Sequence, residues 1–207
     1  LAEADRSSGV AAIDQLARGP LAGDAAFAAA WQALRPQLDD DGQLAAVLAR
    51  RPVVLGFHLS NEAGAADVGV LPPPLLPIDV LGDAGQHLLR WVGHGGSLAR
   101  LQQAATLGGG HLNALIDADG TVRRLPLLVQ HQQGVQPALA LAMARALLGS
   151  PGAPASLSVE PADGPLRALV LRGSAGQLRV AVDAQTLALV PYAAPGMATK
   201  IRAIASK

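Results

Sequence analysis

The stretch from Gly110 to Gly149 constrains the fold more than any other part of the sequence. A short apolar run over 111–116 leads into Asp117-Ala118-Asp119-Gly120, a turn sequence whose glycine supplies the positive φ that hairpin loops need. A second run, from Thr121 to His131, follows at once and has the alternation of a strand. These features predict a β-hairpin that turns at Gly120.

The second strand has an apolar face and one interruption. Leu125, Leu127 and Val129 lie two residues apart and therefore share one face of a strand. Pro126 lies on the other face and cannot donate to a ladder, which indicates an edge strand or a bulge at that point. The same parity puts Arg123 on the face of the three apolar residues, so we expect its side chain on the core side.

A buried helix is predicted after the hairpin. Gly134 predicts a turn, and Pro137 lies where a helix can begin, because its missing N–H would have no helical partner anyway. The segment up to Leu148 is apolar on nearly all sides, so we expect it to be buried on more than one side. Gly149 is the expected stop.

The rest of the chain alternates helical and strand patterns. Helices are expected over 10–18, 24–34, 42–48 and 98–106, and strands over 53–59, 166–171, 178–182 and 187–192. Residues 61–77 contain three consecutive prolines and are expected to form an irregular surface segment. These patterns predict an α/β or α+β fold, in which helices flank a central mixed β-sheet and a β-hairpin lies near the C-terminus.

Three motifs in the central stretch resemble one known family. They are GHLN at 110–113, DxDGxVRRxPL at 117–127 and PALAL at 137–141. Together they are similar to the signature of the type-two CHASE domain, and the similarity covers most of the chain, most strongly from about residue 40 to residue 149. That family consists of extracytoplasmic sensor domains of bacterial receptors, whose cytoplasmic outputs are nucleotide cyclases, histidine kinases or serine/threonine kinases.

The resemblance implies a larger receptor around this chain. We expect residues 1–207 to be a single extracytoplasmic domain and a fragment of a membrane receptor, since the chain begins at Leu1 without a methionine. The sequence contains no apolar run of the roughly 18–20 residues that span a bilayer, and in this family the membrane helices would lie on both sides of such a segment. Membrane contact would then come only through segments outside this chain. The implied location is the periplasmic or extracellular side of the inner membrane.

Composition narrows the range of partners. The formal net charge is zero, so no broad basic surface for nucleic acid is expected. The chain has no cysteine, which excludes structural disulfides and thiolate catalysis. An unknown small molecule or a periplasmic protein is the expected partner, and a homodimer is a further expectation.

Enzymatic motifs are absent from the sequence. There is no G-x-S-x-G elbow for a hydrolase, and the five histidines form no H-x-x-x-H or H-x-H pair for zinc. The turn at 117–120 lacks the distal glutamate of a calcium-binding EF-hand loop.

Asp39-Asp40-Asp41 is better explained as a helix cap than as a metal site. The glycine-rich turn at 93–97 has no basic residue to hold a phosphate, and Ser97 as an N-cap explains it. We therefore expect no catalytic residue, no metal and no cofactor.

Five polar residues of the central stretch remain as candidates for ligand binding. They are Asn113, Asp117, Asp119, Arg123 and Arg124. In one interpretation, an acid pairs with Arg123 and the ion pair fixes the register of the hairpin. In the other, the guanidinium groups hold a carboxylate or a phosphate at the sheet edge, with Arg124 as the main contact and Asn113 as an accessory donor.

Two functions follow from these observations. The first is an extracytoplasmic sensory domain that regulates a cytoplasmic adenylate or guanylate cyclase, or a histidine or serine/threonine kinase. The second is a structural and dimerisation module that binds no ligand. An exposed face on the apolar helix over 138–148 would favour the second, because large exposed apolar patches mark interfaces.

Overall fold

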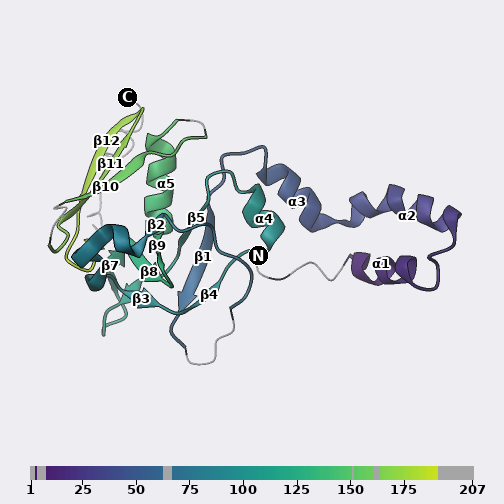
Figure 1. Cartoon of the computed structure of the whole chain (residues 1–207), viewed down its shortest axis with the longest axis horizontal. Helices are drawn as coiled ribbons and strands as arrows, with labels where there is room; N and C mark the ends of the chain where they lie inside the picture. The colour runs from purple at the N-terminus through teal and green to yellow at the C-terminus, as the bar shows by residue number, and fades with distance from the viewer. Residues whose placement is uncertain (1–2, 4–7, 63–66, 151, 161–163, 191–207) are drawn as a thin grey trace.

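The computed structural model describes residues 3, 8–62, 67–150, 152–160 and 164–190. Figure 1 shows their arrangement. The α-helices are α1 Val10–Arg18, α2 Ala25–Leu38, α3 Asp40–Leu48, α4 Ala99–Ala104 and α5 Leu139–Leu148, and a 3-10 segment, η1, covers Ile78–His87. The strands are β1 Leu55–Ser60, β2 Leu76–Pro77, β3 Arg90–Trp91, β4 Gly93–Gly95, β5 Gly109–His111, β6 Leu115–Ile116, β7 Val122–Pro126, β8 Leu128–His131, β9 Gly134–Pro137, β10 Ser156–Glu160, β11 Ala168–Gly173, β12 Gly176–Ala181 and β13 Leu187–Leu189.

The described strands form small sheets, some mixed and some antiparallel. β1 is antiparallel to β4 and parallel to β5, and in the order β2-β9-β8-β3 only the β3·β8 pair is parallel. The sheets β13-β7-β6 and β10-β11-β12 are antiparallel throughout. The fold is therefore α+β, and its strands are spread over several short sheets.

The main core lies where the sheets meet α5. Leu128 of β8, Val135 of β9 and Leu169 of β11 are fully buried, and Leu141 of α5 is nearly so. Fully burying an aliphatic side chain of this kind contributes roughly 1.5–3 kcal/mol. The core thus joins residues 128–141 to the C-terminal sheet.

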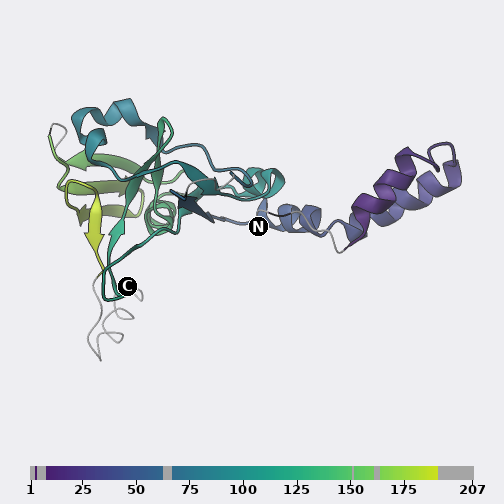
Figure 2. The ribbon, with the colours of Figure 1, turned by 90° about the horizontal axis from the view of Figure 1, so that it is seen from below.

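The helices at the N-terminus project away from this core. In Figures 1 and 2, α1 and α2 lie side by side and extend from the body, and α3 lies between them and α4. Asp39 connects these parts: its Oδ1 caps α3 by accepting from the Gly42 N–H at 3.0 Å and also accepts from Arg100 of α4 at 2.8 Å. Capping by this aspartate agrees with the prediction from the sequence.

One predicted strand is divided in two. The run from Thr121 to His131 turns after Pro126, so that β7 pairs with β6 and β13 whereas β8 pairs with β3 and β9. The backbone N–H of Leu127 donates to the Thr186 carbonyl at 3.0 Å, outside both ladders. The expected interruption at Pro126 is therefore a corner between two sheets.

Three local expectations need correction. Ser97 does not cap α4, because its N–H and carbonyl both bond to Val70 and the helix begins one residue later, with Leu98 as the N-cap. Gly134 begins β9, and Pro137 ends that strand instead of opening the helix, which starts at Leu139. Pairing with neighbouring strands determined these boundaries.

The α5 helix is covered on most of its circumference, but one strip is exposed. Leu141 and Ala142 are buried, whereas Ala140, Met143 and Leu147 face the solvent. Leu147 is 78% exposed and Met143 is 49% exposed. The expectation of burial on more than one side therefore holds except along this strip.

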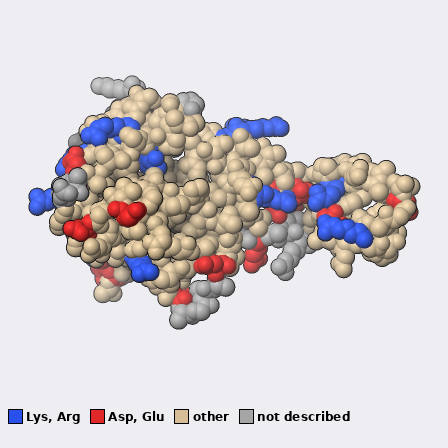
Figure 3. Space-filling model, in the orientation of Figure 1, with Lys and Arg blue, Asp and Glu red and all other residues tan. Residues whose placement is uncertain are grey.

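The surface charges are scattered. Figure 3 shows basic and acidic side chains interspersed among uncharged residues over the visible face. Within the described part of the chain, no helix combines the length and the apolar composition needed to cross a membrane.

Candidate functional site

The predicted polar cluster lies on the β6–β7 hairpin. The Gly120 N–H donates to the Asp117 carbonyl at 2.9 Å, and Gly120 has a φ of 80°, which closes the turn. The Thr121 N–H donates to the Asp119 carboxylate at 3.1 Å. This turn brings both acidic side chains back toward the start of β7.

The two arginines of β7 meet these acids. Arg123 donates to Asp117 at 2.9 Å, and its guanidinium contacts both oxygens of Asp119 at 2.7 and 2.9 Å. Arg124 lies farther off, 3.4 Å from the other oxygen of Asp117. Arg123 is thus the firmly paired arginine, and Arg124 is the more weakly held one.

Arg123 does not enter the core, contrary to the parity argument. Its side chain is 49% exposed and that of Arg124 is 48% exposed. Parity relates residues only within one continuous strand, and the corner after Pro126 separates the exposed part of β7 from the buried residues of β8. The predicted partners of Arg123 are correct, and its predicted face is wrong.

The guanidinium groups keep the acids ionised. Hydrogen bonds from Arg123, with a further one from the Thr121 backbone, lower the pKa of Asp119 to about 2. Hydrogen bonds from Arg123 also lower the pKa of Asp117, against a smaller opposing effect of burial. At neutral pH the cluster therefore presents two carboxylates and two guanidinium groups at the surface, and Arg124 is the less closely paired of the two arginines.

Asn113 has a structural contact in this fold. Its side-chain oxygen accepts from the Leu59 N–H at 2.8 Å, and its amide nitrogen donates to the Leu59 carbonyl at 2.7 Å. Both ends of the amide thus bind the backbone of β1. The two hydrogen bonds hold the segment between β5 and β6 against β1 of the β4-β1-β5 sheet.

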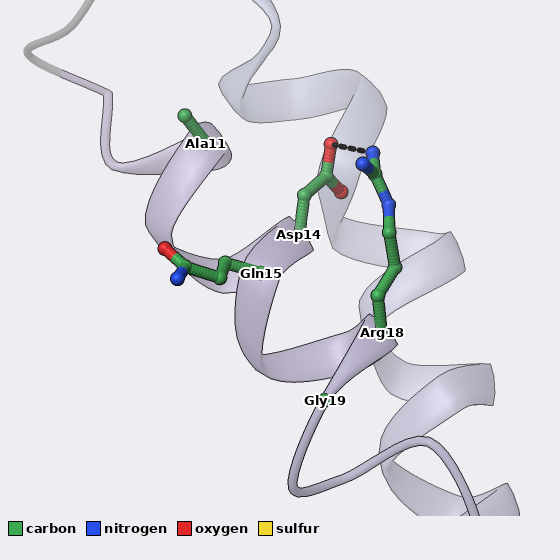
Figure 4. Close-up of a pocket in the computed structure, with 5 residues that line it drawn as sticks. All are labelled: Ala11, Asp14, Gln15, Arg18 and Gly19. Carbon is green, nitrogen blue, oxygen red and sulfur yellow. Dashed lines mark ion pairs between the residues drawn. The ribbon is translucent and has the colours of Figure 1, made fainter.

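A shallow hollow of about 400 Å³ lies on α1 in the projecting helices. Figure 4 shows its lining residues, with Asp14 and Arg18 forming an ion pair at 3.5 Å across it. Asp14 also accepts from Trp31 Nε1 at 2.9 Å and from Arg35 at 3.1 Å. Asp14 therefore joins α1 to α2 through these hydrogen bonds. The hollow results from the way the two helices pack.

The histidines do not form a metal centre. Over the described ranges, no group of three or more His, Cys, Asp or Glu side chains is arranged to hold a metal ion. Burial lowers the pKa of His111 to about 4, so this side chain is neutral at physiological pH. Its ring packs near that of Trp91, with centroids 6.4 Å apart.

Two buried polar residues, His131 and Gln136, were not predicted from the sequence as site residues. His131 and Gln136 are 5% and 3% exposed, and they lie on the β8–β9 hairpin beside a cavity. Polar residues within an otherwise apolar hairpin were the available signal in the sequence. Isolated histidines are ordinarily surface or core residues, and the proline-rich segment that covers these two could not be placed from the sequence.

Comparison with known proteins gives one match. The sequence profile described as the CHASE2 domain matches residues 6–205. No curated protein and no solved structure matches the chain. The match spans nearly the whole sequence, including the hairpin and α5 on which the resemblance rested. The chain therefore belongs to the CHASE2 domain family and is an extracytoplasmic sensory domain, not a catalytic one.

Proposed function

We propose that this domain is the periplasmic sensor of a bacterial membrane receptor and that it binds an anionic ligand at the β6–β7 hairpin. The output would be a cytoplasmic adenylate or guanylate cyclase, or a histidine or serine/threonine kinase. Membership of a sensory family supports the receptor role. The observation that carries the ligand site is the exposed guanidinium of Arg124, held by one contact at 3.4 Å beside the firmly paired Arg123.

The ligand class follows from the chemistry of the cluster. A guanidinium group is a planar fork of donors that fits a carboxylate or a phosphate. The ligand is therefore a small carboxylate or phosphate compound, or an acidic side chain of a periplasmic protein. Such a group would compete with Asp117 for Arg124.

The hairpin is well placed to affect the C-terminal part of the chain. Arg124 lies opposite Leu189 of β13, and the Val190 N–H donates to the Arg123 carbonyl at 2.9 Å. β13 is the last strand among the described residues. A ligand that repositions β7 would thus act directly on the strand that precedes residues 191–207. The ligand would shift the receptor's output only to the extent that it binds one position of β7 more tightly than the other.

A ligand screen tests this proposal. The melting temperature of the domain would be measured with phosphate, dicarboxylic acids, acidic amino acids and neutral sugars, and again for the Arg124→Ala variant. We expect at least one anion to raise the melting temperature of the wild type and to lose this effect in Arg124→Ala. Arg179→Ala is the matched control, since Arg179 is also an exposed arginine in an ion pair, with Glu160 at 2.9 Å. If no anion shifts the wild type, the hairpin site is wrong.

The dimerisation module remains a second candidate because of the α5 strip. Ala140, Met143 and Leu147 form an exposed apolar line on a helix whose other side packs in the core. Dimerisation through this strip would report on assembly without any ligand. Sedimentation of the domain, which measures its oligomeric state, distinguishes the ligand-binding sensor from the dimerisation module.

A further inference from the structure

A second cavity lies beneath the proline-rich segment, away from the charged hairpin. It has a volume of about 330 Å³, near the lower end of the roughly 300–1,000 Å³ found for ligand pockets. Its walls come from residues 71–77, from β4 and from the β8–β9 hairpin. The described residues that line it are Leu71, Pro72, Pro74, Pro77, His94, His131, Gln132, Gln133, Gly134 and Gln136.

Hydrogen bonds at both ends hold the proline-rich wall in place. Before the wall, Val70 exchanges backbone hydrogen bonds with Ser97 at 2.8 and 3.1 Å. After it, the Leu75 N–H donates to the Val135 carbonyl at 2.8 Å. Gly134 lets Pro74 approach closely, because a Cβ on this glycine would lie only 2.5 Å from the Pro74 Cβ. The cavity is therefore bounded by fixed backbone.

Three buried side-chain atoms in this lining lack a hydrogen-bond partner among the described residues, namely His94 Nδ1, His131 Nε2 and Gln136 Oε1. His131 Nδ1 lies 3.2 Å from the Trp91 carbonyl, which makes Nδ1 the protonated nitrogen and leaves Nε2 as an acceptor. Gln136 donates through Nε2 to the Pro72 carbonyl at 3.5 Å, which leaves its Oε1 free. Neither His131 Nε2 nor Gln136 Oε1 has a donor.

Unpaired buried acceptors are costly, and folded proteins pair nearly all of them. The ring of His94 packs edge-on against His131, with centroids 5.3 Å apart, and its own Nδ1 lies 3.2 Å from the Asp67 carboxylate. The side chains that line the cavity thus carry two unpaired acceptors with almost no water-accessible surface, two imidazole rings and the apolar faces of three prolines and a leucine. Its lining contains no Asp, Glu, Lys or Arg.

We propose that this cavity binds a small neutral molecule with several hydroxyl groups, of about the size of one sugar ring. Small shifts of the His131 and Gln136 side chains would let hydroxyl groups donate to Nε2 and Oε1, while the C–H faces of the ring would pack on the prolines. A cation would remain unpaired in a lining without carboxylates, and a purely apolar ligand would leave both acceptors without donors. This site is separate from the charged hairpin and differs from it in ligand class.

Binding of neutral polyols to the full 207-residue chain tests the proposal. The probes are D-glucose, D-galactose and myo-inositol, measured by thermal shift and by calorimetry. At about 100 times its Kd, a ligand should raise the melting temperature of a domain of this size by roughly 5–10 °C. We expect at least one of the three probes to do so.

Substitutions of residues that line the cavity test whether the polyols bind there. Gln136→Leu should weaken Kd by about tenfold or more, because it removes one hydrogen bond to the ligand. The same change also removes the 3.5 Å hydrogen bond to the Pro72 carbonyl, so the melting temperature of the ligand-free variant is measured beside its Kd to show that the variant is folded. His131→Phe is a second variant with the same expected loss of binding. Gln130→Leu is the control, because Gln130 belongs to the same hairpin but does not line the cavity.

The charged hairpin and the cavity can be told apart in one experiment. Polyol binding should persist in Arg124→Ala and be lost in Gln136→Leu, and anion binding should show the reverse. The cavity proposal is overturned if none of the three polyols binds, or if Gln136→Leu binds them as tightly as the wild type. A crystal structure grown with the polyols that shows only water at His131 Nε2 and Gln136 Oε1 would also overturn it.

Discussion

At the scale of single residues, the hairpin shows how local pairing controls charge. Asp119 accepts from both Arg123 and the Thr121 backbone, and this arrangement lowers its pKa from 3.8 to about 2. A carboxyl group whose pKa is lower in the folded state stabilises the fold above its unfolded pKa. That contribution is lost as the pH falls through the folded pKa.

The first prediction concerns acid stability. Between about pH 4 and pH 2, the melting temperature of the wild type should fall more steeply than that of Asp119→Asn, because the variant has no carboxylate to protonate at this position. Melting curves across this pH range provide the measurement. Asp79→Asn, at an exposed position of η1, serves as the control and should follow the wild type. Identical acid profiles for Asp119→Asn and the wild type would show that this pairing contributes no stability.

The ion-pair partners of Arg123 could be predicted from the sequence, but the exposure of its side chain could not. Its pairing with Asp117 and Asp119 could be predicted because the turn at Gly120 brings residues four to six apart together. Its exposure could not be predicted. Whether a strand face is buried depends on what packs against it, and that is decided by segments far away in the chain.

At the scale of elements, the α1–α2 pair depends on one partly buried set of hydrogen bonds. Asp14 accepts from Trp31 and Arg35, and Trp31 is the buried residue of α2. None of the residues in the three described core clusters comes from α1 or α2. The pair therefore has little support from the main core.

The second prediction follows from this separation. Asp14→Ala should speed amide hydrogen exchange in α1 by about tenfold or more, while the melting temperature of the main core changes little. Hydrogen exchange followed by mass spectrometry resolves the two regions. Gln15→Ala, at the next and exposed position of α1, should leave exchange unchanged. A loss of protection throughout the core would instead mean that α1, α2 and the core unfold together.

Elements with local signals were predicted well, and elements that depend on distant pairing were not. The helix over 10–18 has the predicted bounds because helical periodicity and Gly19 define it locally. The predicted strand from Thr121 to His131 divides because Thr186, far along the chain, bonds to Leu127 and Leu128 at the corner. No pattern within residues 121–131 shows that Thr186 will be there.

At the scale of the whole molecule, the exposed strip on α5 decides between sensing alone and sensing through assembly. Leu147 is 78% exposed although Leu141 and Ala142 of the same helix are buried. A second copy of the chain could cover this strip and bury apolar area that water otherwise contacts.

The third prediction is about oligomeric state. If the strip forms a dimer interface, the wild type should sediment as a dimer at micromolar concentration, and Leu147→Glu should sediment as a monomer with an unchanged melting transition. Val80→Glu is the matched control, because Val80 is a 67% exposed apolar residue on η1. A wild type that is monomeric at every concentration would exclude a stable dimer through α5.

The sequence by itself determined the family, helix α1, the turn at Gly120, the C-terminal hairpin and the pairing of Arg123, because each depends on motifs or on residues close together in the chain. Only the tertiary structure decided that Arg123 faces solvent, that Asn113 binds the backbone of β1 and that His131 and Gln136 lie beneath a proline-rich wall. Burial and hydrogen-bond partners at these positions come from segments tens of residues away. Such contacts exist only after the chain has folded.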